Sequence, residues 1–213
     1  MTVHVNEFNP SNSAAMYGVQ TDPRKLKFNN IQSCIAVVLC VYNKVKVGIP
    51  TIKTLIGVHI NTFNLGKGEA ELKIAVARLK QHRTDEPFDI YLVGPYDTHY
   101  AASNLAKKLK SLNPREIKLA NLPVNAGKAA DQDIKVEAMG ANLQISQRDC
   151  VKIEHGVLKD KYDPTKGGVA ITKEQLAAGK HKNVNDKALK PWASITNFET
   201  LKFNILGNMK DRA

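Results

Sequence analysis

The stretch CIAVVLCVY, from Cys34 to Tyr42, is a continuous apolar run and decides the expected fold. It is rich in valine and isoleucine and has the length of a strand that is buried on both faces. A buried helix is the alternative, because short apolar runs fit both structures. Two further segments, Thr54 to Phe63 and Phe88 to Val93, have a similar β-type composition. We therefore predict a β-sheet with residues 34–42 in its interior.

Helical patterns alternate with these strands. Glu69 to Leu79 has apolar residues at helical spacing, with acidic residues at its start and basic residues at its end. Tyr100 to Leu112 is a second amphipathic segment, stopped by Asn113-Pro114, and Glu116 to Leu122 is the next expected strand. This alternation predicts an α/β fold, a layered α/β sandwich with a mixed β-sheet and helices packed on it.

The two ends of the chain have weaker patterns. Residues 1–22 are rich in Asn and Ser, which predicts a flexible N-terminal arm before a single α/β catalytic domain over residues 23–213. After Pro123 we expect a loop or short helix at Asn125 to Asp133. Short strands follow at Leu143 to Ile145, Cys150 to Ile153 and Phe198 to Leu206, and a capped helix begins at Thr172.

The charge balance limits the expected partners. Lys and Arg number 31 against 20 Asp and Glu, a formal charge of +11, and most of the excess lies between Arg24 and Arg83. Such a field attracts acidic protein faces, nucleic acid or anionic lipid, although a merely solvated basic surface is the plainer interpretation. Aromatic residues make up 6% of the chain and no nucleic-acid motif is present, so a protein partner with an acidic surface is favoured over nucleic acid.

The chain also carries few signals of location or of a bound group. It has no apolar run of about 18 residues and no signal-peptide pattern, so we expect no membrane contact. The expected place is the cytoplasm, or a target-cell cytosol reached through a specialised secretion system. Three cysteines fit a reducing compartment, and their spacing matches no zinc motif. No metal and no cofactor are predicted.

Ser33, Cys34 and His59 are the candidates for chemistry. A cysteine at the start of a buried strand can present its sulfur while nearby backbone N–H groups form an oxyanion hole. His59 lies in a second β-like segment, and if the two strands pair, its imidazole can take the thiol proton and later protonate a leaving amine. The alternative is that Cys34 is a small buried apolar residue and His59 a core histidine.

The run Ser33-Cys34-Ile35-Ala36-Val37, continued by Leu39 to Asn43, resembles the Gly-Ser-Cys region of the CheD chemoreceptor glutamine deamidases. That superfamily includes the catalytic domains of cytotoxic necrotizing factors and the Burkholderia lethal factor. The resemblance covers about residues 26–122 and implies an α/β sandwich that hydrolyses a glutamine side-chain amide on a protein. It implies Cys34 as nucleophile and His59 as its partner.

The chain departs from this family in three places. The separation of 25 residues between Cys34 and His59 is longer than is usual in the family. Gln32 stands where the family has glycine, and the threonine that orients the family's histidine would lie near Phe28, where it is absent. Asn29, Asn30 or a backbone carbonyl are the open choices for that orienting role.

The expected function is a protein-glutamine deamidase with a Cys34–His59 dyad, a bacterial effector or toxin, and transglutamination by the same residues stays open. The alternative is a non-catalytic basic binding module for nucleic acid or an acidic protein.

Three weaker candidates have plainer explanations. Asp97-Thr98-His99 follows a strand, where α/β proteins place functional residues, but Asp97 or Thr98 also suits a helix cap. Cys150 and His155 lie close in sequence but lack further metal ligands. Gly66-Lys67-Gly68 has no phosphate-binding spacing, so we interpret it as a loop.

Overall fold

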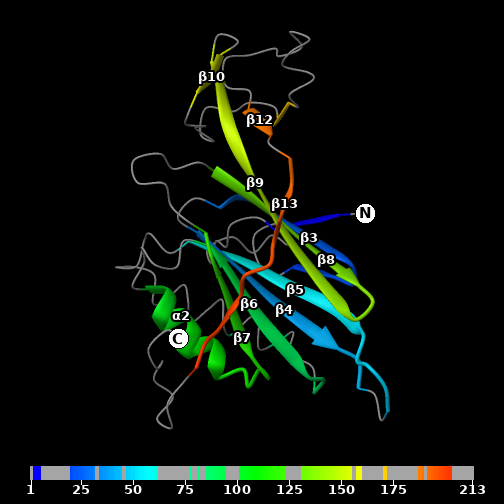
Figure 1. The fold of residues 1–213 in the computed structure, drawn as a ribbon. Helices are drawn as coiled ribbons and strands as arrows, with labels where there is room; N and C mark the ends of the chain where they lie inside the picture. The colour runs from blue at the N-terminus through cyan, green and yellow to red at the C-terminus, as the bar shows by residue number, and fades with distance from the viewer. Residues whose placement is uncertain are drawn as a thin grey trace.

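In the computed structural model, the described residues form two β-sheets that face each other, with one helix outside them (Figure 1). The described residues are 2–5, 20–31, 34–44, 47–61, 77, 81, 85–94, 101–122, 131–154, 157–159, 170–171, 187–189 and 191–202. The sheet that contains the apolar run 34–42 is called sheet B here, and the other is called sheet A.

Sheet B is built around β4 (Cys34–Tyr42), in which every residue is buried. β5 (Ile52–Asn61) and β6 (Phe88–Gly94) pair with it on either side, both antiparallel. β7 (Ile117–Asn121) continues the sheet parallel to β6. The two edges are the short strands β2 (Gln20–Asp22) and β14 (Glu199–Thr200). The apolar run is therefore central because strands cover it on both sides.

Sheet A is dominated by the antiparallel strands β3 (Lys25–Ile31), β8 (Asp131–Met139) and β9 (Asn142–Glu154). β1 (Val3–Val5) runs parallel to β3 at one edge. β10 (Val157–Lys159), β12 (Lys187–Leu189) and β13 (Ala193–Ile195) each pair with β9, and β11 (Ala170–Ile171) pairs with β12.

Alternate side chains of β4 enter two different cores. One face of sheet B packs against the helix α2 (Ala101–Lys110) through Leu105, Ala106 and Leu109. The other face, which includes Cys34 and Cys40, packs against buried side chains of sheet A. Leu26, Phe28, Ile134 and Val136 belong to that second cluster. A strand buried on both faces explains why residues 34–42 have no polar alternation.

The predicted layered α/β sandwich is wrong, because the described chain is mainly β and forms two mixed sheets. Apart from the isolated helical residues Ala77 and Gln81, α2 is the only helix in the described ranges. The difference arises after Pro123, where β8 and β9 supply the long strands of a second sheet in place of a loop and short strands. A sheet, and not a layer of helices, covers the Cys34 face of sheet B.

The other expected elements have mixed outcomes. α2 confirms the amphipathic segment at 100–112, whereas the helices expected at 69–79 and from Thr172 lie outside the described residues, except for Ala77. Residues 1–22 include β1 and β2, so both ends of this segment are paired in the sheets. No helix among the described residues has the length and apolar character needed to cross a membrane.

Candidate functional site

Cys34 and His59 lie on the same face of two paired strands. The register sets His59 of β5 opposite Ala36 of β4, and Cys34 opposite Asn61. Cys34 and Ala36 point to the same side because side chains alternate along a strand. Cys34 and His59 are therefore diagonal neighbours, a relation in which backbones are roughly 7–8 Å apart and long side chains can meet.

Both side chains are buried between the two sheets. Cys34 is 4% exposed and His59 is 3% exposed. Two residues before His59, a Cβ atom on Gly57 would lie only 2.8 Å from Leu26 Cδ1 and 2.9 Å from Phe28 Cζ. The sheets therefore approach closely beside the histidine, and glycine leaves the room that this approach requires.

The surroundings of His59 are almost entirely apolar. The Phe28 ring meets the imidazole edge-on, with 6.4 Å between ring centroids. Within the described part of the chain, neither Nδ1 nor Nε2 has a hydrogen-bond partner. Burial lowers the pKa of His59 to about 4, and a nearby backbone group of Val5 opposes this shift without reaching hydrogen-bond geometry. The imidazole is therefore neutral at pH 7.

The backbone of Cys34 is held by a close contact with β6. A Cβ atom on Gly94 would lie 2.6 Å from the Cys34 carbonyl oxygen and 3.1 Å from Ile35 Cα. The Gly94 carbonyl in turn accepts a hydrogen bond of 2.9 Å from the Leu122 N–H. Four strands begin or end at the same end of sheet B, at Cys34, Asn61, Gly94 and Asn121. The candidate nucleophile Cys34 therefore lies at an end of sheet B and not in the middle of a strand.

Cys40 lies six residues further along β4, on the same face. It is fully buried and its side chain interacts with Tyr42. Burial is the main cause that raises the pKa of Cys40 to about 12, and the Asp89 carboxylate adds to it. Neither Cys34 nor Cys40 forms a disulfide. Cys40 is therefore an unreactive thiol with which Cys34 can be compared.

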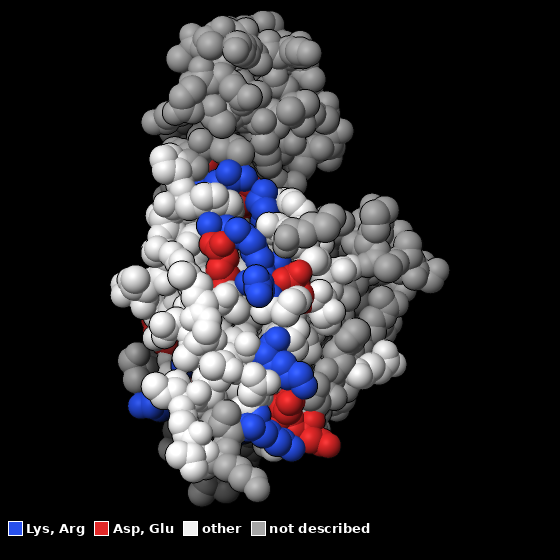
Figure 2. All heavy atoms as spheres, turned by 90° about the vertical axis from the view of Figure 1, so that its right-hand side faces the viewer, with Lys and Arg blue, Asp and Glu red and all other residues white. Residues whose placement is uncertain are grey.

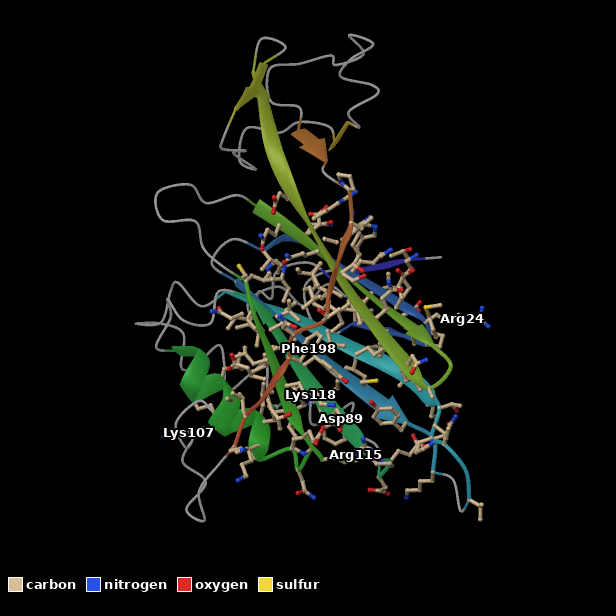
Figure 3. The ribbon with its side chains drawn as sticks, viewed as in Figure 1. Arg24, Asp89, Lys107, Arg115, Lys118 and Phe198 are labelled. Atoms are coloured by element: carbon tan, nitrogen blue, oxygen red, sulfur yellow. The ribbon has the colours of Figure 1, made fainter. Side chains whose placement is uncertain are left out.

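A polar cluster around Asp89 was missed by the sequence analysis (Figure 3). Asp89 is 1% exposed and accepts hydrogen bonds from Arg115 Nε at 3.0 Å, Arg115 Nη2 at 3.1 Å and the Tyr42 hydroxyl at 3.0 Å. The Arg115 guanidinium also lies 4.6 Å from the centre of the Tyr42 ring. The single acidic residue inside the apolar run of β6 was the available signal. Because its bonds are satisfied internally, we assign this cluster a structural role.

Seven basic side chains of the described region form ion pairs. Figure 2 shows Lys and Arg interspersed with Asp and Glu down one face of the molecule. The ion pairs are Lys25–Glu137, Lys27–Asp133, Lys53–Glu86, Arg115–Asp89, Lys118–Glu116, Lys135–Glu137 and Arg148–Asp133. Contact with Lys135 and Lys25 lowers the pKa of Glu137, as expected for a paired carboxylate. Much of the charge on this face is therefore neutralised locally.

Several predicted candidates lie outside the described residues: Ser33, Asp97-Thr98-His99, His155 and Gly66-Lys67-Gly68. Cys150 belongs to β9, but its side chain is not described. Among the described side chains, no three His, Cys, Asp or Glu residues come together as a metal ion would require. Of the predicted site, the structure therefore places Cys34 and His59 as diagonal neighbours on one face of β4 and β5, and no hydrogen bond joins the thiol to the imidazole.

Comparison with known proteins provides no further assignment. No protein-family model matches the chain, and no curated protein matches it.

Proposed function

We propose that this protein is a cysteine-dependent amidohydrolase that deamidates glutamine side chains of a protein substrate, with Cys34 and His59 as its dyad. The observation that carries the proposal is the diagonal placement of the two residues on one face of β4 and β5, where β4 begins and β5 ends. The resemblance of residues 33–43 to the glutamine deamidases supplies the substrate class.

The imidazole of His59, which has no hydrogen-bond partner among the described residues, adds support. A buried polar group without a hydrogen bond costs roughly 1–3 kcal/mol, and such groups are uncommon in native proteins. A histidine retained in this state, diagonal to a cysteine on the neighbouring strand, is consistent with a group kept for chemistry. A histidine with a purely structural role at this position would be expected to donate or accept at least one hydrogen bond.

The reaction that fits this pair is acyl transfer to sulfur and then to water. His59 takes the proton of the Cys34 thiol, and the thiolate attacks the carboxamide carbon of glutamine. The tetrahedral intermediate collapses as His59 returns the proton to the leaving ammonia. A water molecule, deprotonated by His59, then cleaves the thioester to give glutamate and the free thiol. The oxyanion is assigned to backbone N–H groups at Ser33 and Cys34, and an amine in place of water would give transglutamination.

The neutral state of His59 defines its role in this scheme. With a pKa near 4, the imidazole is a base before the reaction and not a cation that stabilises a resting thiolate. In this scheme the reaction depends on proton transfer from Cys34 to the neutral imidazole as the substrate binds. Because the side chains of Cys34 and His59 are both nearly buried, a substrate can reach them only if the two sheets separate at the end where β4 begins and β5 ends.

The alternative of a basic binding module has less support. Its argument was the excess of positive charge between Arg24 and Arg83, and the described basic residues of that region include the ion-paired Lys25, Lys27 and Lys53. Pairing with carboxylates reduces the field that an anionic partner would meet.

The test compares the two thiols of β4 in the native protein. Iodoacetamide labelling, followed by mass spectrometry, should modify Cys34 well before Cys40, and His59→Leu should slow the labelling of Cys34 more than that of Cys40. In parallel, a cell extract incubated with wild type should gain glutamate at specific glutamines, Cys34→Ala should abolish this change, and Cys40→Ala should leave it intact.

The proposal fails if Cys34 and Cys40 are alkylated at the same rate in the folded protein. It also fails if Cys34→Ala converts the same glutamines as wild type.

A further inference from the structure

The largest exposed apolar side chains of the described region gather at one end of the molecule. Val47 is 93% exposed, Ile49 is 79% exposed and Met139 is 61% exposed. Val47 and Ile49 belong to the loop between β4 and β5, and Met139 ends β8 at the turn into β9. No other large hydrophobic residue in the described ranges is comparably exposed.

The two loops are joined. The Ile52 N–H donates a 2.9 Å hydrogen bond to the Gly140 carbonyl, which connects the start of β5 to the β8–β9 turn. Figure 1 shows the start of β5 next to that turn and the β4–β5 loop projecting beyond it, past the ends of the strands. Gly48 has φ +110° and Gly140 has φ +65°, conformations that turn the chain at each tip. We call the exposed residues Val47 and Ile49 of the β4–β5 loop the apolar tip.

The apolar tip is remote from the candidate dyad. β4 begins at Cys34 and leads to the β4–β5 loop at Tyr42, so its full length separates the two sites. At roughly 3.4 Å per residue, that length is on the order of 27 Å. The apolar tip therefore does not belong to the proposed active site.

Although the sequence predicted no membrane contact, we propose that the apolar tip is a contact surface for a bilayer that contains anionic lipid. Convex loops with aliphatic side chains can enter the headgroup region without a complementary pocket, and nearby lysines add attraction to anionic lipid. Residues 43–53 contain Lys44, Lys46 and Lys53 and no acidic residue. Lys53 is paired with Glu86, so among the described cations of residues 43–53 the exposed Lys44 is the one assigned to attract anionic lipid. This inference is independent of the proposed function.

The test is sedimentation of the full-length protein with vesicles. The probes are vesicles of phosphatidylcholine alone and of phosphatidylcholine with phosphatidylserine in equal parts. Wild type should bind the anionic vesicles more tightly than the neutral ones, and added salt should weaken the binding. The double variant Val47→Ser, Ile49→Ser should lose about tenfold or more in binding, since it removes apolar area without adding charge.

A charge variant and a control variant separate the contributions of charge and apolar area to vesicle binding. Lys44→Ala should reduce binding to anionic vesicles and leave the weak binding to neutral vesicles unchanged. Ala193→Ser with Thr196→Ser, at exposed positions away from the tip, is the matched control and should bind as wild type does. Circular dichroism of each variant checks that it is folded.

Two results would overturn the proposal. One is a folded wild type that sediments with neither vesicle. The other is a double serine variant that binds as well as wild type. In the first case the apolar tip would instead be assigned to contact with another protein.

Discussion

His59 is an ionisable side chain held between two sheets without a polar partner in the described region. Its pKa falls from 6.5 to about 4 on folding because burial disfavours the charged form. The unfolded chain therefore binds a proton more readily than the folded chain. The resulting destabilisation is absent above pH 6.5, grows as the pH falls through the interval between the two pKa values, and is complete below about 4.

We expect the free energy of unfolding of wild type to drop by roughly 2–3 kcal/mol between pH 7 and about pH 4.5 from this group alone. His59→Leu, which has no titrating group, should lack this part of the drop. Urea unfolding of both proteins at the two pH values measures the difference. The carboxylates also titrate in this range, but their effect on stability is the same in wild type and in the variant. A wild type and a variant with parallel pH profiles would contradict the buried, neutral imidazole.

Asp89 provides a second prediction at the scale of one residue. Asp89→Asn keeps the shape of the side chain but removes the negative charge to which Arg115 and Tyr42 donate hydrogen bonds. Because Arg115 is 46% exposed and stays hydrated, we expect a loss of about 2–3 kcal/mol, less than for a fully buried pair. Glu86→Gln, which breaks a pair with the half-exposed Lys53, should cost below about 1 kcal/mol. Equal losses in chemical denaturation would contradict the structural role of Asp89.

At this scale the sequence predicted the two reactive candidates but not their surroundings. The pairing of Cys34 and His59 on one face follows from the strand order and register, and strand composition suggested it. Their burial depends on sheet A, which is formed largely by residues after 123. The Asp89 cluster depends on Arg115, which lies 26 residues away in sequence, so no local pattern connects the two.

The elements of sheet B were the most predictable. β4 has the predicted bounds, Cys34–Tyr42, and β6 extends one residue past the predicted end at Val93. Fully buried strands are apolar throughout, which makes them visible in a sequence. β8 was missed although Ile134 and Val136 alternate with Asp133, Lys135 and Glu137. One face of this strand is polar, so the segment lacks the continuous apolar character that identified β4.

The close contact between β6 and β4 leads to a prediction about how these two strands pack. Gly94→Ala would place a Cβ against the backbone of Cys34 and Ile35, and backbone atoms cannot rotate away as a side chain can. We expect a loss of about 2–3 kcal/mol in the free energy of unfolding. Cys34 alkylation should also change, because the strand must shift. Urea unfolding and labelling kinetics measure these effects.

Gly140→Ala is the control for this experiment. It has open space around its Cβ position, and the only expected penalty is about 1 kcal/mol for its φ of +65°. Its rate of Cys34 alkylation should equal that of wild type. A Gly94→Ala protein as stable as Gly140→Ala would show that the two strands are not packed as closely as described.

At the scale of the whole molecule, residues 191–202 connect the two sheets. β13 pairs with β9 in sheet A, and β14 pairs with β7 in sheet B. At one end of this connection the Trp192 ring lies 4.4 Å from the Arg148 guanidinium, and at the other Phe198 meets Tyr91 edge-on at 5.4 Å. Ile195 and Phe198 pack against the core between the sheets. This connecting segment therefore contacts both sheets and their shared core.

Trp192 is the only tryptophan of the chain, so its fluorescence reports on the connecting segment alone. Because this segment packs on the shared core, we expect fluorescence and far-UV circular dichroism to follow one unfolding transition in urea. Phe198→Ala should lower both midpoints together. The free energy of unfolding should fall by about 1–2 kcal/mol, because removing a half-buried ring costs less stability than removing a fully buried one. Thr196→Ala, at an exposed position of the same segment, should leave both midpoints in place. A fluorescence transition that precedes the circular dichroism transition in wild type would mean that the segment detaches first, and the two sheets would then be held together by their core alone.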